Sequence, residues 1–244
     1  MGKPLVYLVL GCKGSEQFKV VSDLIEFGTS AEESAAVYYS SHDEDDFSSD
    51  FGVKHRQAAT GVYQFSGRSL DLTVEGEPDL VFIVADGLAN PSDVVEAFHA
   101  WLPESGCELA RVLTVLNCDL AVERKVAFAW FECCIHFSDV VLLAKRENVA
   151  NKSMKAFLDH YEEECYPCLW VYVKKGRVNN PSLVLDIQAR RITRIFDVPE
   201  VFDDDEEEDY LDEEIAGDIT KDRFLKCISG GHRALELPDI SKFL

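Results

Sequence analysis

The stretch VLGCKGSEQFKVV, residues 9–21, begins in the way that a phosphate-binding loop begins. An apolar strand runs into Gly11, Gly14 follows, and a segment with helical spacing starts near Glu16. A loop between a strand and a helix can present backbone N–H groups to a phosphate, and the helix N-terminus adds a favourable dipole. Such a loop is completed by a Lys that bridges two phosphates and by a Ser or Thr that ligates Mg²⁺.

The side chains at the end of this loop are not those that nucleotide chemistry needs. Counted from the first glycine, the final Gly, Lys and Ser/Thr positions hold Glu16, Gln17 and Phe18. Glu16 adds a negative charge where a triphosphate would lie, and Phe18 cannot ligate a metal. A variant phosphate-binding loop has a first Lys before a glycine, as in Lys13-Gly14, and a second Lys that would stand at position 18. This chain does not fit that variant. This chain has Lys19 instead, which is rotated by about 100° of helix.

Strand-like and helix-like segments alternate along the first 175 residues. The central strands are continuous apolar runs, which is typical of strands buried on both faces of a parallel sheet. This alternation predicts βαβ units and the α/β fold class, with a mostly parallel sheet flanked by helices in three layers. The expected strands are 4–10, 35–40, 79–85, 110–117, 139–144 and 168–175, and the expected helices are 16–27, 92–102, 121–134 and 149–163.

The composition changes after residue 177, which predicts an α/β domain at 1–177 and a small irregular, acidic C-terminal extension at 178–244. Within the first domain, residues 41–78 are expected to form a loop with one short strand. Three segments of the extension have an expected structure: a two-stranded ribbon at 182–198, a solvated acidic run at 203–214, which could attract a basic partner, and a short helix at 219–228.

Charge and cysteine content exclude several classes of function. The 244 residues carry 24 basic and 45 acidic side chains, a net charge of −21, so we expect no nucleic acid and no anionic membrane as partner. The apolar stretch Leu5–Leu10 is too short for a signal peptide or a membrane span, which favours a cytoplasmic protein. Eight cysteines spread through apolar runs indicate free thiols rather than a disulfide scaffold.

Three later segments resemble, in order and spacing, the CobW-like P-loop GTPases, metal-handling proteins of the SIMIBI class. They correspond to the Walker B region, the following strand and the guanine-specificity strand of that family. The segments read DLVFIVADGLANPSDVVEAF at 79–98, ARVLTVLNCD at 110–119 and FSDVVLLAKRENV at 137–149. The resemblance covers about residues 4–150 and implies a three-layer P-loop NTPase-like fold.

The same resemblance implies functional residues, and several of them are replaced. The Walker B Glu falls on Val84, which leaves Asp86 as a stand-in on the Mg²⁺ side. The guanine motif N-K-x-D keeps its Lys as Lys145 and ends in Glu147. The Glu147 carboxylate could still accept hydrogen bonds from the guanine N–H groups, although its side chain is one methylene longer than that of Asp. The metal motif Cys-x-Cys-Cys should fall near 60–72, where there is no cysteine.

These losses together predict a degenerate, catalytically inactive pseudo-GTPase that acts as a binding or scaffolding protein, with a protein partner or a second copy of itself. We assign no catalytic residue. The expected remnants of the nucleotide site are Gly11, Lys13, Gly14, Ser15, Gln17, Asp86, Lys145 and Glu147. Two alternatives stay open: a nucleotide-dependent metal chaperone that uses GTP or GDP with Mg²⁺ and carries zinc at a relocated site, and a module that binds a small anion.

Cys165 and Cys168 are the candidates for a relocated metal site. Their C-x-x-C follows a helix and precedes a strand, which is the opposite of the thioredoxin-like arrangement. Joint metal binding with Cys133 and His136 requires these elements to meet in space, and buried free thiols are the favoured alternative. His42 and the carboxylates after it lack the spacing of a calcium loop and are expected to form a solvated loop.

Overall fold

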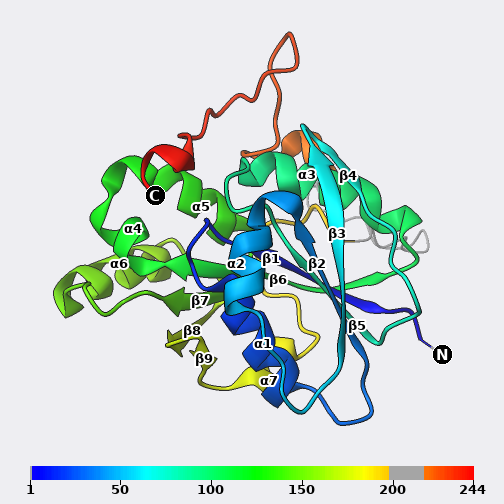
Figure 1. The fold of residues 1–244 in the computed structure, drawn as a ribbon. Coiled ribbons are helices and arrows are strands. Elements are labelled where there is room, and N and C mark those ends of the chain that lie inside the picture. Colours follow the sequence, from blue (N-terminus) through cyan, green and yellow to red (C-terminus); the bar gives the residue numbers. More distant parts are fainter. Residues whose placement is uncertain (1, 198–216) are drawn as a thin grey trace, which may run out of the picture.

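The computed structural model of the chain describes residues 2–197 and 217–244 (Figure 1). Their main feature is a nine-stranded sheet with the order β4-β3-β2-β5-β1-β6-β7-β8-β9. Neighbouring strands are parallel except at the two edges, where β4 and β9 run antiparallel to β3 and β8. The strands are β1 Leu5–Leu10, β2 Ala35–Ser40, β3 Ala58–Ser66, β4 Ser69–Asp71, β5 Leu80–Val84, β6 Glu108–Asn117, β7 Val140–Ala144, β8 Leu169–Lys174 and β9 Arg177–Val178.

The sheet is the middle layer of three, as the sequence predicts. Side chains alternate between the two faces of a strand, and in β1 both sets are buried. Leu8 and Leu10 belong to one apolar cluster, whereas Tyr7 and Val9 belong to another. A strand buried on both faces needs apolar residues at every position, which explains the continuous apolar runs.

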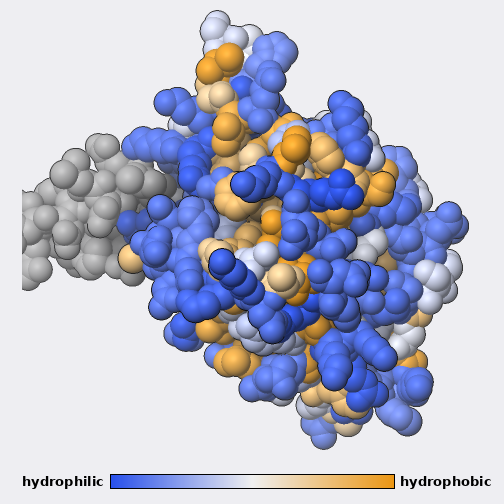
Figure 2. Space-filling model, turned by 90° about the vertical axis from the view of Figure 1, so that its left-hand side faces the viewer, coloured by the Kyte–Doolittle hydropathy of each residue, from blue (hydrophilic) through white to orange (hydrophobic). Residues whose placement is uncertain are grey.

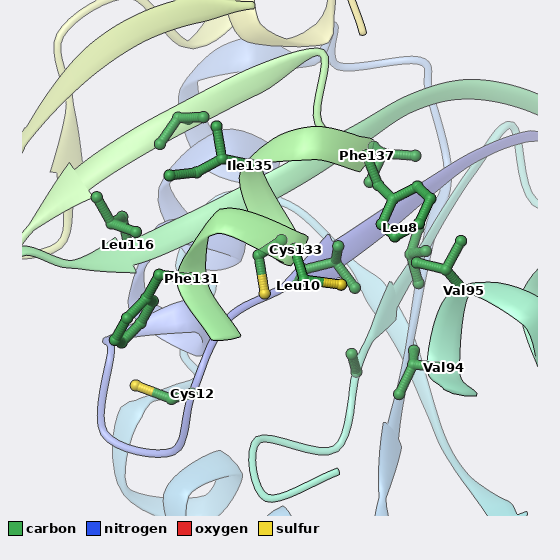
Figure 3. Packing of buried hydrophobic residues seen from close by; sticks show 14 of the residues in the cluster. Leu8, Leu10, Cys12, Val94, Val95, Leu116, Phe131, Cys133, Ile135 and Phe137 are labelled. Atoms are coloured by element: carbon green, nitrogen blue, oxygen red, sulfur yellow. The ribbon is translucent and has the colours of Figure 1, made fainter. Parts of the chain in front are cut away.

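Helices cover both faces of the sheet. The helices are α1 Gln17–Gly28, α2 Glu44–Asp50, α3 Pro91–Trp101, α4 Cys118–Glu123, α5 Phe128–Phe137, α6 Asn151–Glu163 and α7 Pro181–Leu185. The cluster of Tyr7 and Val9 joins the sheet to α1, α2 and α7. The second cluster, which contains Leu8 and Leu10, joins it to α3, α4, α5 and α6. Figure 3 shows part of the second cluster, in which side chains of α5 pack over β1 and beside α3.

The side of the molecule that carries α4 and α6 faces the reader in Figure 2. Its apolar surface is broken up by hydrophilic side chains. Among the described residues, no helix is long and apolar enough to cross a lipid bilayer.

Two expectations for the first 177 residues are wrong in detail. Residues 41–78 are not mainly loop: they form the 3₁₀ turn η1 Ser41–Asp43, α2, β3 and β4. The acidic residues that suggested a solvated loop lie in the first turn of α2, where negative charge favours a helix. The helix expected at 121–134 is divided into α4 and α5 by the 3₁₀ turn η3 Lys125–Ala127, after Arg124 leaves the helical region with φ −105° and ψ 80°.

The ribbon expected at 182–198 is also wrong over the part that is described. The chain forms α7 and then an irregular strap through residue 197. Backbone groups of this segment form hydrogen bonds with side chains and not with a second strand. The buried Arg111 guanidinium donates to the carbonyls of Leu183 at 2.7 Å and Gln188 at 3.0 Å. The Asp139 carboxylate accepts from the backbone N–H of Arg190 at 2.6 Å.

The helix expected at 219–228 is wrong too, because only the 3₁₀ turn η4 Ile219–Lys221 and a single turn at Asp222 form. A short hairpin follows, in which Cys227 and Arg233 form an isolated antiparallel β-bridge between their backbones. The acidic run 203–214 lies outside the described residues. The division into 1–177 and 178–244 stays a prediction, although α7 packs against α1.

Candidate functional site

The candidate site lies where parallel strands end. β1 ends at Leu10, β5 at Val84 and β7 at Ala144, and the carboxyl ends of parallel strands share one edge of the sheet. In open α/β sheets, ligands bind in the crevice at this edge. The predicted remnants of the nucleotide site all follow these ends, in the loops 11–16, 85–90 and 145–149, or begin α1. The sequence therefore located this edge of the sheet.

The glycine loop keeps the backbone path that its glycines predict. Gly11 has φ +150° and Gly14 has φ +77°, and a Cβ on Gly11 would lie 2.7 Å from the Val115 carbonyl oxygen. The Lys13 N–H donates to the Gly87 carbonyl at 3.0 Å. A Cβ on Gly87 would lie 2.5 Å from that same nitrogen. The loop after β1 and the loop after β5 are therefore in direct backbone contact.

Glu16 occupies a backbone position that favours glycine. Its φ is +70°, in the left-handed region that L side chains adopt at a steric disadvantage. Its carboxylate lies 3.7 Å from the Lys19 ammonium and 3.5 Å from that of Lys145. The structure thus brings Lys145 to the loop, as predicted, and pairs it with a carboxylate of the loop itself.

Gln17, at the position of the phosphate-binding Lys, points back into the loop. Its Nε2 donates to the Gly11 carbonyl at 3.0 Å, and only 6% of the residue is exposed. Ser15 is fully buried, with its hydroxyl 3.0 Å from the thiol of Cys12. Two of the expected phosphate contacts are therefore internal contacts of the loop.

Phe18, at the position of the metal-binding hydroxyl, is a core residue. It is 3% exposed and meets the rings of Tyr39 and Phe47 edge-on, at centroid distances of 5.9 and 5.4 Å. Tyr39 and Phe47 stack on each other at 4.0 Å. Since Phe47 comes from α2, the sequence analysis missed this contact together with the helix.

Asp86 is held by the segment that follows β2. Its Oδ2 lies 2.7 Å from Nδ1 of His42 and accepts from the Ser40 hydroxyl at 3.3 Å, and its Oδ1 accepts from the Leu88 N–H at 2.9 Å. Asp86 is 6% exposed, whereas the imidazole of His42 is largely exposed. The expected stand-in for a Mg²⁺ carboxylate is therefore already engaged by three polar groups.

Asp43 is a buried acid that the sequence analysis placed in a solvated loop. It is 3% exposed, and its Oδ2 accepts from the Gly87 N–H at 3.3 Å. Burial, and then the neighbouring charge of Asp86, raise the pKa of Asp43 from 3.8 to about 6. Its place directly after the carboxyl end of β2 was the available signal, because that end meets the same edge as β1 and β5.

Lys13 and Glu147 are the remaining predicted polar side chains at this edge. The Lys13 ammonium donates to the carbonyl of His42 at 3.3 Å. The hollow that reaches Gly11 and Asp86 has a volume of about 10 Å³, which is space for about one water molecule. Glu147 is exposed on the loop after β7. The site thus combines the carboxylates of Asp43, Asp86 and Glu16 with a loop whose Gln17 and Ser15 side chains bond within the loop.

The cysteine candidates are spread over different environments. Cys165 is exposed and Cys168 is buried, and burial raises the pKa of the Cys168 thiol to about 12. Cys133 is fully buried beside Ser92. The ring of His136 is bonded to Asp222 at 2.7 Å. Within residues 2–197 and 217–244, no three His, Cys, Asp or Glu side chains gather in a way that could hold a metal ion.

A central parallel strand that runs into a glycine loop and a helix, within a three-layer α/β sheet, defines a P-loop NTPase-like protein. The particular family follows from the sequence: residues 54–167 match the family described as "CobW/HypB/UreG, nucleotide-binding domain". Over these residues the chain is similar to the CobW-like proteins. The matched residues begin after the glycine loop and include the strands and loops from β3 to the end of α6.

Two solved structures are similar at low identity. The Zn(II)-bound YjiA GTPase from E. coli is 13% identical, with a TM-score of 0.42 over 78% of this chain and 67% of that chain. A Zn(II)-bound triple mutant of the YjiA GTPase is 14% identical, with a TM-score of 0.43 over the same shares. No curated protein is similar enough in sequence to count as a match.

Proposed function

We propose that this CobW-like chain is a pseudo-GTPase, which has lost GTP hydrolysis and acts by binding a protein partner or a second copy of itself. Two observations support the proposal: the match to the CobW/HypB/UreG family, and the contacts that the side chains of the glycine loop make within the protein. A retained scaffold without its reactive groups can still present surfaces to a partner.

The observation that carries the proposal is the internal use of Gln17 and Phe18. A phosphate-binding loop needs a free ammonium and a free hydroxyl at these two positions. Here one side chain donates to the Gly11 carbonyl at 3.0 Å, and the other is 3% exposed in an aromatic cluster. Neither can turn toward a ligand unless the loop or the core opens.

The charges of the site support the same proposal. Asp43 and Asp86 are close enough for each charge to disfavour the other, and both are nearly buried. An anion placed beside them would meet further repulsion in a poorly solvated environment. The nearest cation of the loop, Lys13, is bonded to a backbone carbonyl.

Titration calorimetry of GTP, GDP and ATP with Mg²⁺, together with a phosphate-release assay, tests the proposal on metal-free protein. We expect no binding heat and no turnover. The proposal is wrong if the pure protein turns over GTP or ATP and the activity disappears in Lys13→Ala or Asp86→Asn. Lys3→Ala, which changes an exposed lysine before the other end of β1, is the matched control.

A nucleotide-dependent metal chaperone is the alternative, and the exposed thiol of Cys165 is the feature that favours it. Its test is the zinc and cobalt content of the purified protein. Stoichiometric metal that is lost in Cys165→Ser and kept in Cys227→Ser, the other exposed cysteine, would favour the chaperone. Binding of inorganic phosphate without nucleotide would favour a small-anion module instead.

A further inference from the structure

The opposite edge of the sheet, where β1 and β5 begin, carries two open hollows. One has a volume of about 490 Å³ and lies against α7 and the strap that follows it. The other, of about 620 Å³, lies among residues 2–5, 74–80 and 105–107. Leu5, Glu33 and Leu80 line both, so the two hollows are adjacent, and we call them together the amino-edge groove.

The walls of the amino-edge groove combine apolar and polar groups in about equal measure and are partly open to solvent. Leu5 and Leu80 form its floor, and Leu183 and Ile187 stand along one side with 42% and 57% of their surface exposed. Large apolar side chains exposed around one concave surface mark a site of interaction.

The rim of the groove is negative. Glu33, Glu77, Asp79 and Asp186 contribute carboxylates, against the single ammonium of Lys3. All four carboxylates are exposed. Glu33 accepts from the Ser30 N–H at 2.6 Å and Asp79 accepts from the Ser34 N–H at 2.7 Å, whereas Asp186 interacts electrostatically with the buried Arg111. Burial raises the pKa of Tyr7, which also lines the groove, to about 12; Arg111 lowers this pKa, and Glu33 and Asp186 raise it by smaller amounts.

The wall formed by α7 and the strap is held in place from beneath. Tyr7 donates from its hydroxyl to the Leu185 carbonyl at 2.7 Å. The fully buried Arg111 donates to the carbonyls of Leu183 and Val184 at 2.7 and 3.1 Å. Asp139 holds the strap further on through Arg191 at 3.2 Å. A wall that is already ordered loses little conformational freedom on binding.

We propose that the amino-edge groove binds an extended segment of another protein in which apolar and basic side chains alternate. The apolar side chains would lie against Leu5, Leu80 and Ile187, and the basic ones would meet the carboxylates of Glu33 and Asp186. The groove lies at the opposite end of the strands from the glycine loop, so this proposal does not depend on the loss of nucleotide chemistry.

Fluorescence anisotropy of a labelled hexapeptide of alternating Leu and Arg tests the proposal on the full chain. We expect saturable binding that weakens with salt, and no binding of the matching Leu and Glu hexapeptide. The double variant Glu33→Gln, Asp186→Asn should weaken binding about tenfold, as expected for two partly exposed ion pairs. The double variant Leu183→Ala, Ile187→Ala should weaken it by a similar factor.

The control is the double variant Glu162→Gln, Glu163→Gln, which removes two exposed carboxylates from α6 and should change binding by less than about twofold. The proposal is overturned if the peptide does not bind, or if the control weakens binding as much as the groove variants do. It is also overturned if sedimentation shows a dimer that Leu183→Ala, Ile187→Ala dissociates, since a second copy would then occupy the groove.

Discussion

The two ends of the β1 strand lead to opposite kinds of surface. At its carboxyl end the loop is filled by the chain itself, and a hollow of about 10 Å³ is left beside Asp86. At its amino end two adjacent hollows of about 490 and 620 Å³ are bordered by the exposed carboxylates of Glu33, Glu77, Asp79 and Asp186. The fold determines where ligands usually bind, at the carboxyl edge. The side chains determine whether that edge is open, and here they close it.

The replacement of Phe18 by Ser, the residue type that a functional loop would have, should break the closed edge most severely. We expect the free energy of unfolding to fall by about 3–4 kcal/mol, because a ring that is 3% exposed would leave a cavity beside Tyr39 and Phe47. Urea unfolding followed by circular dichroism measures the change.

Phe27→Ser is the matched control for that change. It makes the same substitution in the same helix, α1, but at a ring that is 57% exposed beside the open edge. We expect a loss of less than about 1 kcal/mol. Equal losses at the two positions would contradict the contrast between a closed and an open end.

Asp43→Asn should change how the stability of the protein depends on pH. Because burial raises the pKa of Asp43 from 3.8 to about 6, the folded chain binds more protons than the unfolded chain between these values, and stability falls as pH rises through them. Removal of the charge should stabilise the protein by about 1–3 kcal/mol at pH 7 and by much less near pH 4.

Urea unfolding of Asp43→Asn at pH 7 and at pH 4 measures this effect. Asp45→Asn, at an exposed position in α2, should leave the difference between the two pH values unchanged. If Asp43→Asn is less stable than the wild type at pH 7, the hydrogen bond from the Gly87 N–H stabilises the fold by more than burial of the carboxylate destabilises it.

The smallest expected effect is at Glu16. Glycine relieves the left-handed backbone at φ +70°, whereas alanine keeps the strain and removes the same carboxylate. We expect Glu16→Gly to be more stable than Glu16→Ala by about 1 kcal/mol, as measured by urea unfolding. A more stable alanine variant would show that the loop changes its backbone path once the contacts to Lys19 and Lys145 are lost.

Most of the parallel sheet could be predicted from the sequence. The runs that became β1, β5 and β7 are apolar at every position because helices cover both of their faces. The expected helix at 16–27 is α1 within one residue at each end. The same reasoning located the glycine loop, Asp86 and Lys145 at one edge, since they follow the ends of these strands.

The elements that were missed depend on contacts distant in sequence. β3 is half exposed and contains Gly61, so it lacks a continuous apolar run, and its pairing with β2 determines its structure. α2 is short and polar and is held by Phe47. The strap after α7 depends on Arg111 and Asp139, two buried charges whose partners no local pattern reveals.

The aromatic contact among Phe18, Tyr39 and Phe47 has an evolutionary consequence. A single substitution that places a hydroxyl at position 18 would empty a packed site shared by α1, β2 and α2, and would therefore lower the stability of the protein. The neighbouring rings would have to change as well. A hydroxyl at position 18 would therefore have to evolve together with the side chains of β2 and α2 that pack against this position.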